Sequence, residues 1–363
     1  MVRPPHLSLP RLALPPPEVP EIDRSADLPH PRAMLGLVGH KAAEAEFLSL
    51  YRAGTLHHAF LLTGPEGIGK ATFAYRAARF LLAESERGSG LFGEPRDLAV
   101  DETSRTAQLV ANEAHPDLVV LKRRYRTKDK KFPTEIGVEE TRSALGLFSK
   151  TAAFGGWRII IIDSVDDLNA ASANAILKTL EEPPARAMFL MVSHQPERLL
   201  PTIRSRCRVL PFQPLPVADL AAMLPELIPG ATLDPDMADW AEGSVRRALR
   251  LADPKLRGFL ALVDSILQAL PKRLHREIDQ LAEAVRGAEQ ALPDLLERIE
   301  LWLHARIRAA LATGDLAPAQ DLAEFWSRMQ DNARQMEAFN LDRRAFVITL
   351  VDELSTLVSG RGR

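Results

Sequence analysis

A length of 363 residues allows two or three domains of about 100–200 residues each. The hydrophobic content of 46% permits a sizeable buried core and argues against a disordered chain. A formal net charge of −2 argues against an autonomous, strongly basic nucleic-acid binder, but not against a local basic patch.

The chain contains one cysteine, Cys207, so an intrachain disulfide and a four-cysteine zinc site are both excluded. We therefore expect no zinc and no other metal centre. No apolar run approaches the roughly 18 residues of a membrane span, and the N-terminus has no apolar signal core. These features predict a cytoplasmic protein without a membrane partner.

Residues 1–33 are rich in proline and predict a flexible arm with partial polyproline character. After this arm the pattern predicts a helix over 39–53 and an apolar strand over 58–63. A glycine-rich turn and a long helix over 70–83 follow the strand. Residues 84–112 predict loops and a short helix.

A second apolar strand is predicted over 118–121, and a strongly basic run over 122–131 follows it. The basic run is most simply a solvated hairpin or loop, and the alternative is a loop that faces DNA. A helix over 138–149 then leads to the run 158–163, whose four isoleucines are typical of a strand buried on both faces.

A helix over 170–182 is stopped by two prolines, and another apolar strand is expected over 188–193. Strands that alternate with helices predict βαβ units, and therefore an α/β domain with a parallel sheet and flanking helices. From about Val217 onward the pattern is almost wholly helical.

A phosphate loop stands between the first predicted strand and the long helix, which is the context that such a loop requires. Its glycines turn backbone N–H groups toward phosphate oxygens, the helix N-terminus adds positive potential, and the lysine adds a point charge. The residues of this candidate nucleotide site are Gly64, Pro65, Glu66, Gly67, Ile68, Gly69, Lys70, Ala71 and Thr72.

Two positions are unsuited to ATP hydrolysis. Magnesium binding requires a hydroxyl directly after the lysine, but Ala71 stands there, and Thr72 is rotated by about 100° on a helix. Asp163 ends the isoleucine strand and is either a vestigial metal position or a simple strand-end loop residue. Ser164 follows it where a water-activating carboxylate is needed. ATP binding is therefore expected to be weak or vestigial.

The phosphate loop, the isoleucine strand, the segment 174–184 and the triplet Ser205, Arg206 and Cys207 together resemble the clamp-loader branch of the AAA+ proteins. Within that branch the resemblance is greatest to the delta-prime family of bacterial DNA polymerase III, and it covers about residues 34–251. It implies an AAA+ phosphate-loop domain over 34–212, a small helical lid over 213–255 and a helical collar over 256–363 that mediates oligomerisation. Many relatives also carry a four-cysteine zinc module, which is missing here.

The resemblance implies that Arg206 acts as an arginine finger, in trans, on the ATP of a neighbouring subunit. It assigns Arg247 to the chain's own nucleotide and places residues 37–40 near adenine. The implied function is that of a stator-like subunit of the clamp loader, which helps to load the sliding clamp on primed DNA. The implied partners are the motor (gamma/tau) and delta subunits.

Other functions stay open at this point. An ATP-hydrolysing motor subunit would need Ser or Thr at position 71 and Glu at position 164. Another phosphate-loop NTPase or kinase would leave the Arg206 segment and the helical C-terminal third unexplained. For the collar, an apolar stripe on the helix after Pro293 could serve either oligomerisation or an internal core. That stripe comprises Leu295, Leu296, Ile299, Trp302, Leu303 and Ile307.

Overall fold

The computed structural model describes residues 10–14, 19–22, 30–87, 94–288, 290–314, 316–339 and 341–360. Its contacts divide the chain into two units, Met1–Leu249 and Arg250–Arg363. The predicted lid segment over 213–255 thus belongs mostly to the first unit. The finer division of that unit stays a prediction.

The first unit is an α/β fold, as the alternating pattern predicted. Its strands are β1 (Ala59–Thr63), β2 (Leu118–Leu121), β3 (Arg158–Asp163), β4 (Ala187–Ser193) and β5 (Arg208–Pro211). Its helices are α1 (Lys41–Arg52), α2 (Lys70–Arg87), α3 (Arg105–Ala111), α4 (Val138–Leu145), α5 (Ala170–Glu181), α6 (Pro201–Arg204), α7 (Val217–Leu227), α8 (Pro235–Ala241) and α9 (Val245–Arg250), with short 3-10 turns at Pro31–Ala33, Gly146–Ser149, Val165–Asp167 and Pro196–Arg198.

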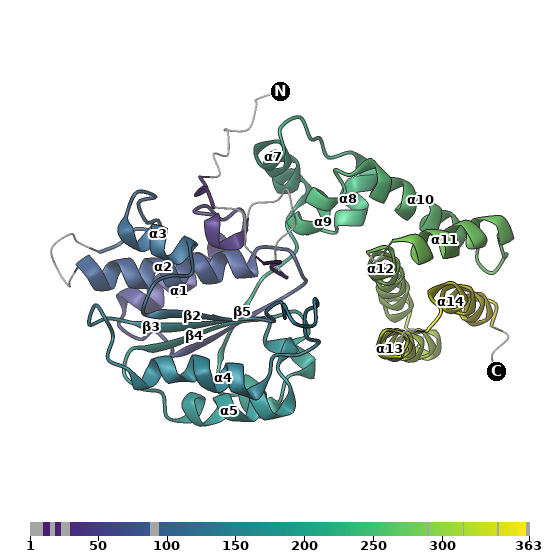
Figure 1. Ribbon diagram of the computed structural model, residues 1–363. Helices are drawn as coiled ribbons and strands as arrows, with labels where there is room; N and C mark the ends of the chain where they lie inside the picture. The colour runs from purple at the N-terminus through teal and green to yellow at the C-terminus, as the bar shows by residue number, and fades with distance from the viewer. Residues whose placement is uncertain are drawn as a thin grey trace. The chain divides into compact units, whose positions relative to one another are not determined.

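The five strands are all parallel and lie in the order β2-β3-β4-β1-β5. Figure 1 shows α1, α2 and α3 on one face of the sheet and α4 and α5 on the other. Side chains alternate between these faces, so Ile159 and Ile161 pack with α1 and α2, while Ile160 and Ile162 pack with α4 and α5. Both faces are therefore covered, which is why β3 reads as a continuous apolar run.

The helix ends follow local chemistry. Asn169 caps α5 by accepting a hydrogen bond from the Ser172 amide at 2.9 Å, and Ser104 caps α3 in the same way. Pro183 and Pro184 follow the C-cap residue Glu182 of α5, so the helix cannot continue. These signals fix the direction in which α5 leads into β4.

Parts of the proline-rich arm lie against the first unit. Leu12 donates to the Ala33 carbonyl at 2.9 Å, Leu35 donates to the Pro10 carbonyl at 3.0 Å, and Arg32 pairs with Glu113 at 3.1 Å. Residues 1–9, 15–18 and 23–29, on which most of the predicted flexibility falls, lie outside the described residues.

The second unit is helical throughout its described residues. It contains α10 (Pro254–Ala269), α11 (His275–Gly287), α12 (Ala291–Ala312), α13 (Leu316–Ala338) and α14 (Arg343–Val358). The predicted apolar stripe of α12 lies in this unit's own core, where Leu295, Ile299 and Leu303 are buried. The stripe thus serves internal packing and gives no separate support for a surface that binds other subunits. No described helix combines the length and apolar character that a membrane span requires.

Candidate functional site

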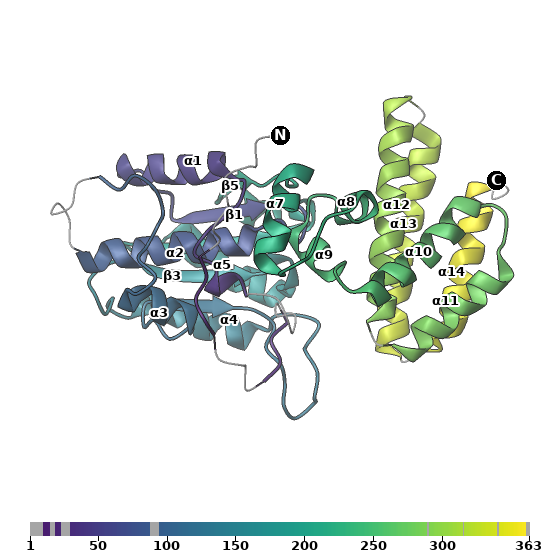
Figure 2. The same cartoon turned by 90° about the horizontal axis from the view of Figure 1, so that it is seen from above.

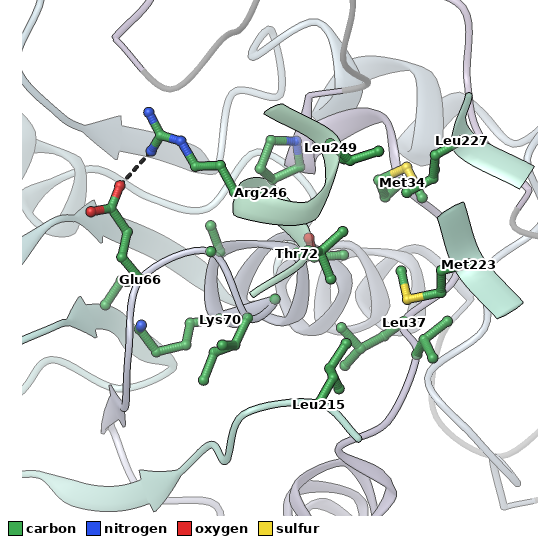
Figure 3. A pocket seen from close by; sticks show the side chains of 18 of the residues that line it. Met34, Leu37, Glu66, Lys70, Thr72, Leu215, Met223, Leu227, Arg246 and Leu249 are labelled. Atoms are coloured by element: carbon green, nitrogen blue, oxygen red, sulfur yellow. Dashed lines mark hydrogen bonds and ion pairs between the residues drawn. The ribbon is translucent and has the colours of Figure 1, made fainter. Parts of the chain in front are cut away.

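The candidate nucleotide site is a cavity of about 190 Å³ in the first unit. The predicted residues Glu66 to Thr72 and Asp163 line it, whereas Gly64 and Pro65 lie outside the lining. Figure 3 shows two ends: Glu66, Lys70 and Arg246 form a charged end, and Met34, Leu37, Met223, Leu227 and Leu249 lie toward an apolar end. A charged end and an apolar end together suit a phosphorylated ligand that carries a flat base.

The loop adopts its shape through backbone conformations that glycine permits. Gly67 has φ +77° and Gly69 has φ +111°, both on the positive side that other residues rarely adopt. A Cβ on Gly67 would stand 2.4 Å from Ser244 Oγ and 2.6 Å from the Arg246 Cβ. The loop is therefore packed directly against the first turn of α9.

Lys70 opens α2, and its side chain is almost fully buried, with 2% of its surface exposed. Its Nζ donates to the Gly64 carbonyl at 2.6 Å and to the Pro65 carbonyl. Burial lowers the pKa of Lys70 to about 8, although the nearby carboxylates of Glu66 and Asp163 oppose that shift. To bind a phosphate, this ammonium has to exchange loop carbonyls for phosphate oxygens.

The carboxylate that organises the end of β3 is Asp166, which the sequence analysis left without a role. It accepts from Ser164 Oγ at 2.7 Å, from Ser193 Oγ at 2.8 Å and from the His194 amide at 2.6 Å. These bonds join the ends of β3 and β4. Ser164, in the position of the missing general base, is thus buried and used for structure.

His194 is a second pocket residue that the sequence did not indicate. Burial, reinforced by the charge of Lys70, lowers the pKa of His194 to about 4, so the imidazole is neutral at neutral pH. Its position at the end of β4 is the only sequence signal that could have identified it.

Of the two consecutive arginines in α9, one lines the cavity and the other does not. Arg246 lines the cavity and pairs with Glu66 at 2.5 Å. Arg247, the predicted nucleotide residue, lies outside the lining and is 3.8 Å from Glu242. Consecutive helical residues differ by about 100° in direction, so the helix phase brings Arg246 rather than Arg247 to this cavity.

Ala71 and Thr72 also line the cavity, and Figure 3 shows the Thr72 side chain in its wall. Leu37 and Val38, expected near adenine, line it as well. His40 Nε2 lies 2.7 Å from the Ile68 carbonyl and supports the loop from behind. The structure thus brings most of the predicted site together.

Replacing Gly67 by alanine is expected to destabilise the first unit and to separate the loop from α9. Gly54→Ala is the matched control, because Gly54 has φ +66° with no atom within 4 Å of a new Cβ. Both variants carry the backbone penalty of about 1–2 kcal/mol, and only Gly67→Ala adds the clash. Chemical unfolding should show the larger loss for Gly67→Ala; equal losses would contradict the packing argument.

Arg206 lies away from this cavity, just after α6. Its Nη2 pairs with Glu181 Oε1 at 2.8 Å, its Nη1 donates to the Thr202 carbonyl at 3.0 Å, and 34% of its side chain is exposed. Glu181 is the last residue of α5, so the guanidinium also faces the negative end of that helix. These contacts orient Arg206 while part of its surface stays accessible.

The reactivity of the neighbouring Cys207 thiol reports how closely the turn around Arg206 is packed. Its Sγ donates to the Ile203 carbonyl at 3.0 Å, and burial raises the pKa of the thiol to about 12. At mildly alkaline pH, its thiolate fraction should be about a thousandfold below that of an ordinary cysteine. A disulfide reagent should react correspondingly slowly with the native chain and at the normal rate in denaturant. Equal rates in the two states would contradict this burial.

Metal binding has no support among the described residues, which contain no group of three or more His, Cys, Asp or Glu side chains placed to hold an ion. His115 and Asp117 are both buried. Asp117 Oδ1 accepts from the Ala153 amide at 2.8 Å, so it closes a turn.

Comparisons with known proteins agree with the sequence resemblance. The family model described as "DNA polymerase III, delta subunit" matches residues 39–216. The delta' subunit of DNA polymerase III from Pseudomonas aeruginosa is 35% identical over 259 residues, which cover 70% of this chain and 73% of the relative. The Escherichia coli delta' subunit is 33% identical, and the match covers 47% of each chain.

The tau subunit of Escherichia coli DNA polymerase III is 29% identical over 84% of this chain and 48% of its own length, so the chain spans about half of the two Escherichia coli relatives. A gamma subunit-related structure from Thermotoga maritima is 17% identical, with a TM-score of 0.36, over 85% of this chain and 98% of its own. By its identity to the Pseudomonas relative and its share of that protein's length, the chain belongs to the family of the delta-prime subunits of the DNA polymerase III clamp loader.

Proposed function

We propose that this chain is a stator-like clamp-loader subunit that donates Arg206 to the ATP site of a neighbouring motor subunit. The main support for this proposal is the position of Arg206. Its side chain is partly exposed, is oriented by Glu181, and lies outside the lining of the chain's own cavity. An arginine so placed is available to a nucleotide held by another chain. Guanidinium is always charged and can fork onto phosphate oxygens.

The surroundings of Arg206 support a contact with another subunit. Leu200 and Val209, which flank it in the sequence, are 40% and 48% exposed, and Val209 belongs to the edge strand β5. Exposed apolar side chains around a partly desolvated arginine are typical of an interface. This surface suits the gamma/tau type of subunit, and the delta subunit is the other expected partner.

The chain's own nucleotide site is proposed to bind ATP weakly or not at all. Ala71 offers no hydroxyl to magnesium, Ser164 is committed to Asp166, and the Lys70 ammonium is already occupied by loop carbonyls. The second unit, which contains the predicted collar over 256–363, is proposed to hold the sister subunits. Within the complex the chain would help to open the sliding clamp and load it on primed DNA.

An ATP-hydrolysing motor subunit is the second candidate. It is favoured by the match to the tau subunit over 84% of this chain and by the intact lysine of the phosphate loop. The missing hydroxyl at position 71 and the missing carboxylate at position 164 weigh against it.

Reconstitution tests the proposed role directly. The full chain is mixed with gamma/tau and delta subunits, separated by size exclusion, and the ATPase of the complex is compared with that of the motor subunits alone. We expect co-elution and a higher ATPase in the presence of this chain. Failure to co-elute, or an ATPase that does not respond to the chain, would contradict the proposal.

A further inference from the structure

The basic run between β2 and α4 forms a hairpin, which we define as residues 124–132 and call the basic hairpin. Arg126 and Lys131 pair across it in an antiparallel bridge, with the Arg126 amide 2.9 Å from the Lys131 carbonyl. The rings of Tyr125 and Phe132 pack edge to face at 5.3 Å between their centroids. Figure 2 shows this loop projecting from the first unit, on the side where α3 and α4 are labelled in that view.

Its charge is concentrated and unneutralised. Five cations are exposed and none has an ion pair within the described part of the chain: Arg124, Arg126, Lys128, Lys130 and Lys131. Asp129 is the one acidic residue of the hairpin, so five positive charges less one give a net charge of +4 in a chain whose total is −2. This is a local field that the overall charge conceals.

The two cations that directly precede the basic hairpin, by contrast, are paired. Lys122 lies 3.0 Å from Glu113 and Arg123 lies 2.8 Å from Asp167. The backbone of Arg124 also forms an isolated antiparallel β-bridge with the backbone of Glu21. The base is therefore fixed to the first unit, and the tip needs little ordering when it meets a partner.

We propose that the basic hairpin binds the phosphate backbone of a nucleic acid. Between Arg126 and Lys131 the tip has no apolar side chain, so it lacks the apolar core that a protein partner requires. Long cationic side chains without carboxylate partners can instead replace the counterions of a polyanion. The half-buried rings of Tyr125 and Phe132 offer stacking surface for unpaired bases. This inference does not depend on the role of Arg206.

Salt dependence tests the proposal with the full chain. Binding of fluorescent single-stranded and duplex DNA oligonucleotides is followed by anisotropy across a salt series. The test variant carries Arg126→Ala, Lys128→Ala, Lys130→Ala and Lys131→Ala. If four phosphate contacts are lost, the slope of log affinity against log salt should fall in magnitude by about 3, and low-salt affinity should fall by about 100-fold or more.

A control variant loses the same charge elsewhere through Lys41→Ala, Lys255→Ala, Lys272→Ala and Arg276→Ala, all at exposed positions. Its salt slope should stay close to that of the original chain. Equal losses of DNA affinity in the two variants would mean that only the net charge of the chain matters, and would overturn the proposal. So would an unchanged slope in the hairpin variant, or a hairpin variant that loses binding to polyglutamate but not to DNA.

Discussion

Replacing Arg206 by alanine is expected to lower ATP turnover at one site of the assembled complex by about 10³-fold or more. The arginine is proposed to stabilise charge that develops on a neighbour's γ-phosphate, so its loss raises the barrier of the chemical step. With one copy of this chain per complex, only one site would receive the arginine, so total ATPase should fall partly while clamp loading falls further. Steady-state ATPase and clamp loading on primed DNA measure the two effects.

Assembly and folding should survive this change. The pair between Arg206 and Glu181 is partly exposed, and such pairs contribute about 0–1 kcal/mol. Arg204→Ala is the matched control, since Arg204 is exposed in the same turn and its side chain donates to the Pro196 carbonyl at 3.3 Å. Arg206→Lys should restore little of the ATP turnover and clamp loading that Arg206→Ala loses, because an ammonium lacks the planar fork of the guanidinium. Clamp loading at the original rate by the Arg206→Ala complex would remove Arg206 from the proposed function.

The isolated chain is expected to hydrolyse ATP at no more than the background rate. A motor site needs a magnesium ligand after the lysine and a carboxylate that activates water, and both are missing at Ala71 and Ser164. Lys70→Ala should therefore leave the background unchanged. A phosphate-release assay on the purified chain, with and without magnesium, measures this.

Turnover at the rate of a motor subunit, abolished by Lys70→Ala, would favour the second candidate function. Lys70→Ala also controls for contaminating ATPases, because a contaminant is insensitive to it. Nucleotide binding without turnover, by contrast, is compatible with the account, since the cavity retains a charged end and an apolar end.

Most of the sheet could be predicted because buried parallel strands carry a strong sequence signal. The predicted bounds of β2 and β3 agree with the structure, and β4 begins one residue earlier than expected. The apolar pattern does not mark β5, which lies at the sheet edge and has only Leu210 of its four residues buried. An edge strand with a solvated face lacks the apolar run that marks a central one.

The candidate site was predictable where one segment suffices, as in the phosphate loop. It was not predictable where distant segments meet. Asp166 gains its role only because β3 and β4 are neighbours in the sheet, which brings Ser193 and His194 to it. The choice of Arg246 over Arg247 depends on the helix phase of α9 and on its contact with Gly67, neither of which the sequence motif specifies.

The most direct test of the central claim is the affinity of the assembled complex for ADP with aluminium fluoride, which imitates the phosphoryl group in transfer. Stabilisation confined to the transition state should appear in this analogue and much less in ATP itself. Arg206→Ala is predicted to weaken binding of the analogue at one site by about 10³-fold, with ATP affinity changed by less than about tenfold. Unchanged binding of the analogue, or an equal loss for ATP, would contradict a role for Arg206 in the neighbour's chemistry.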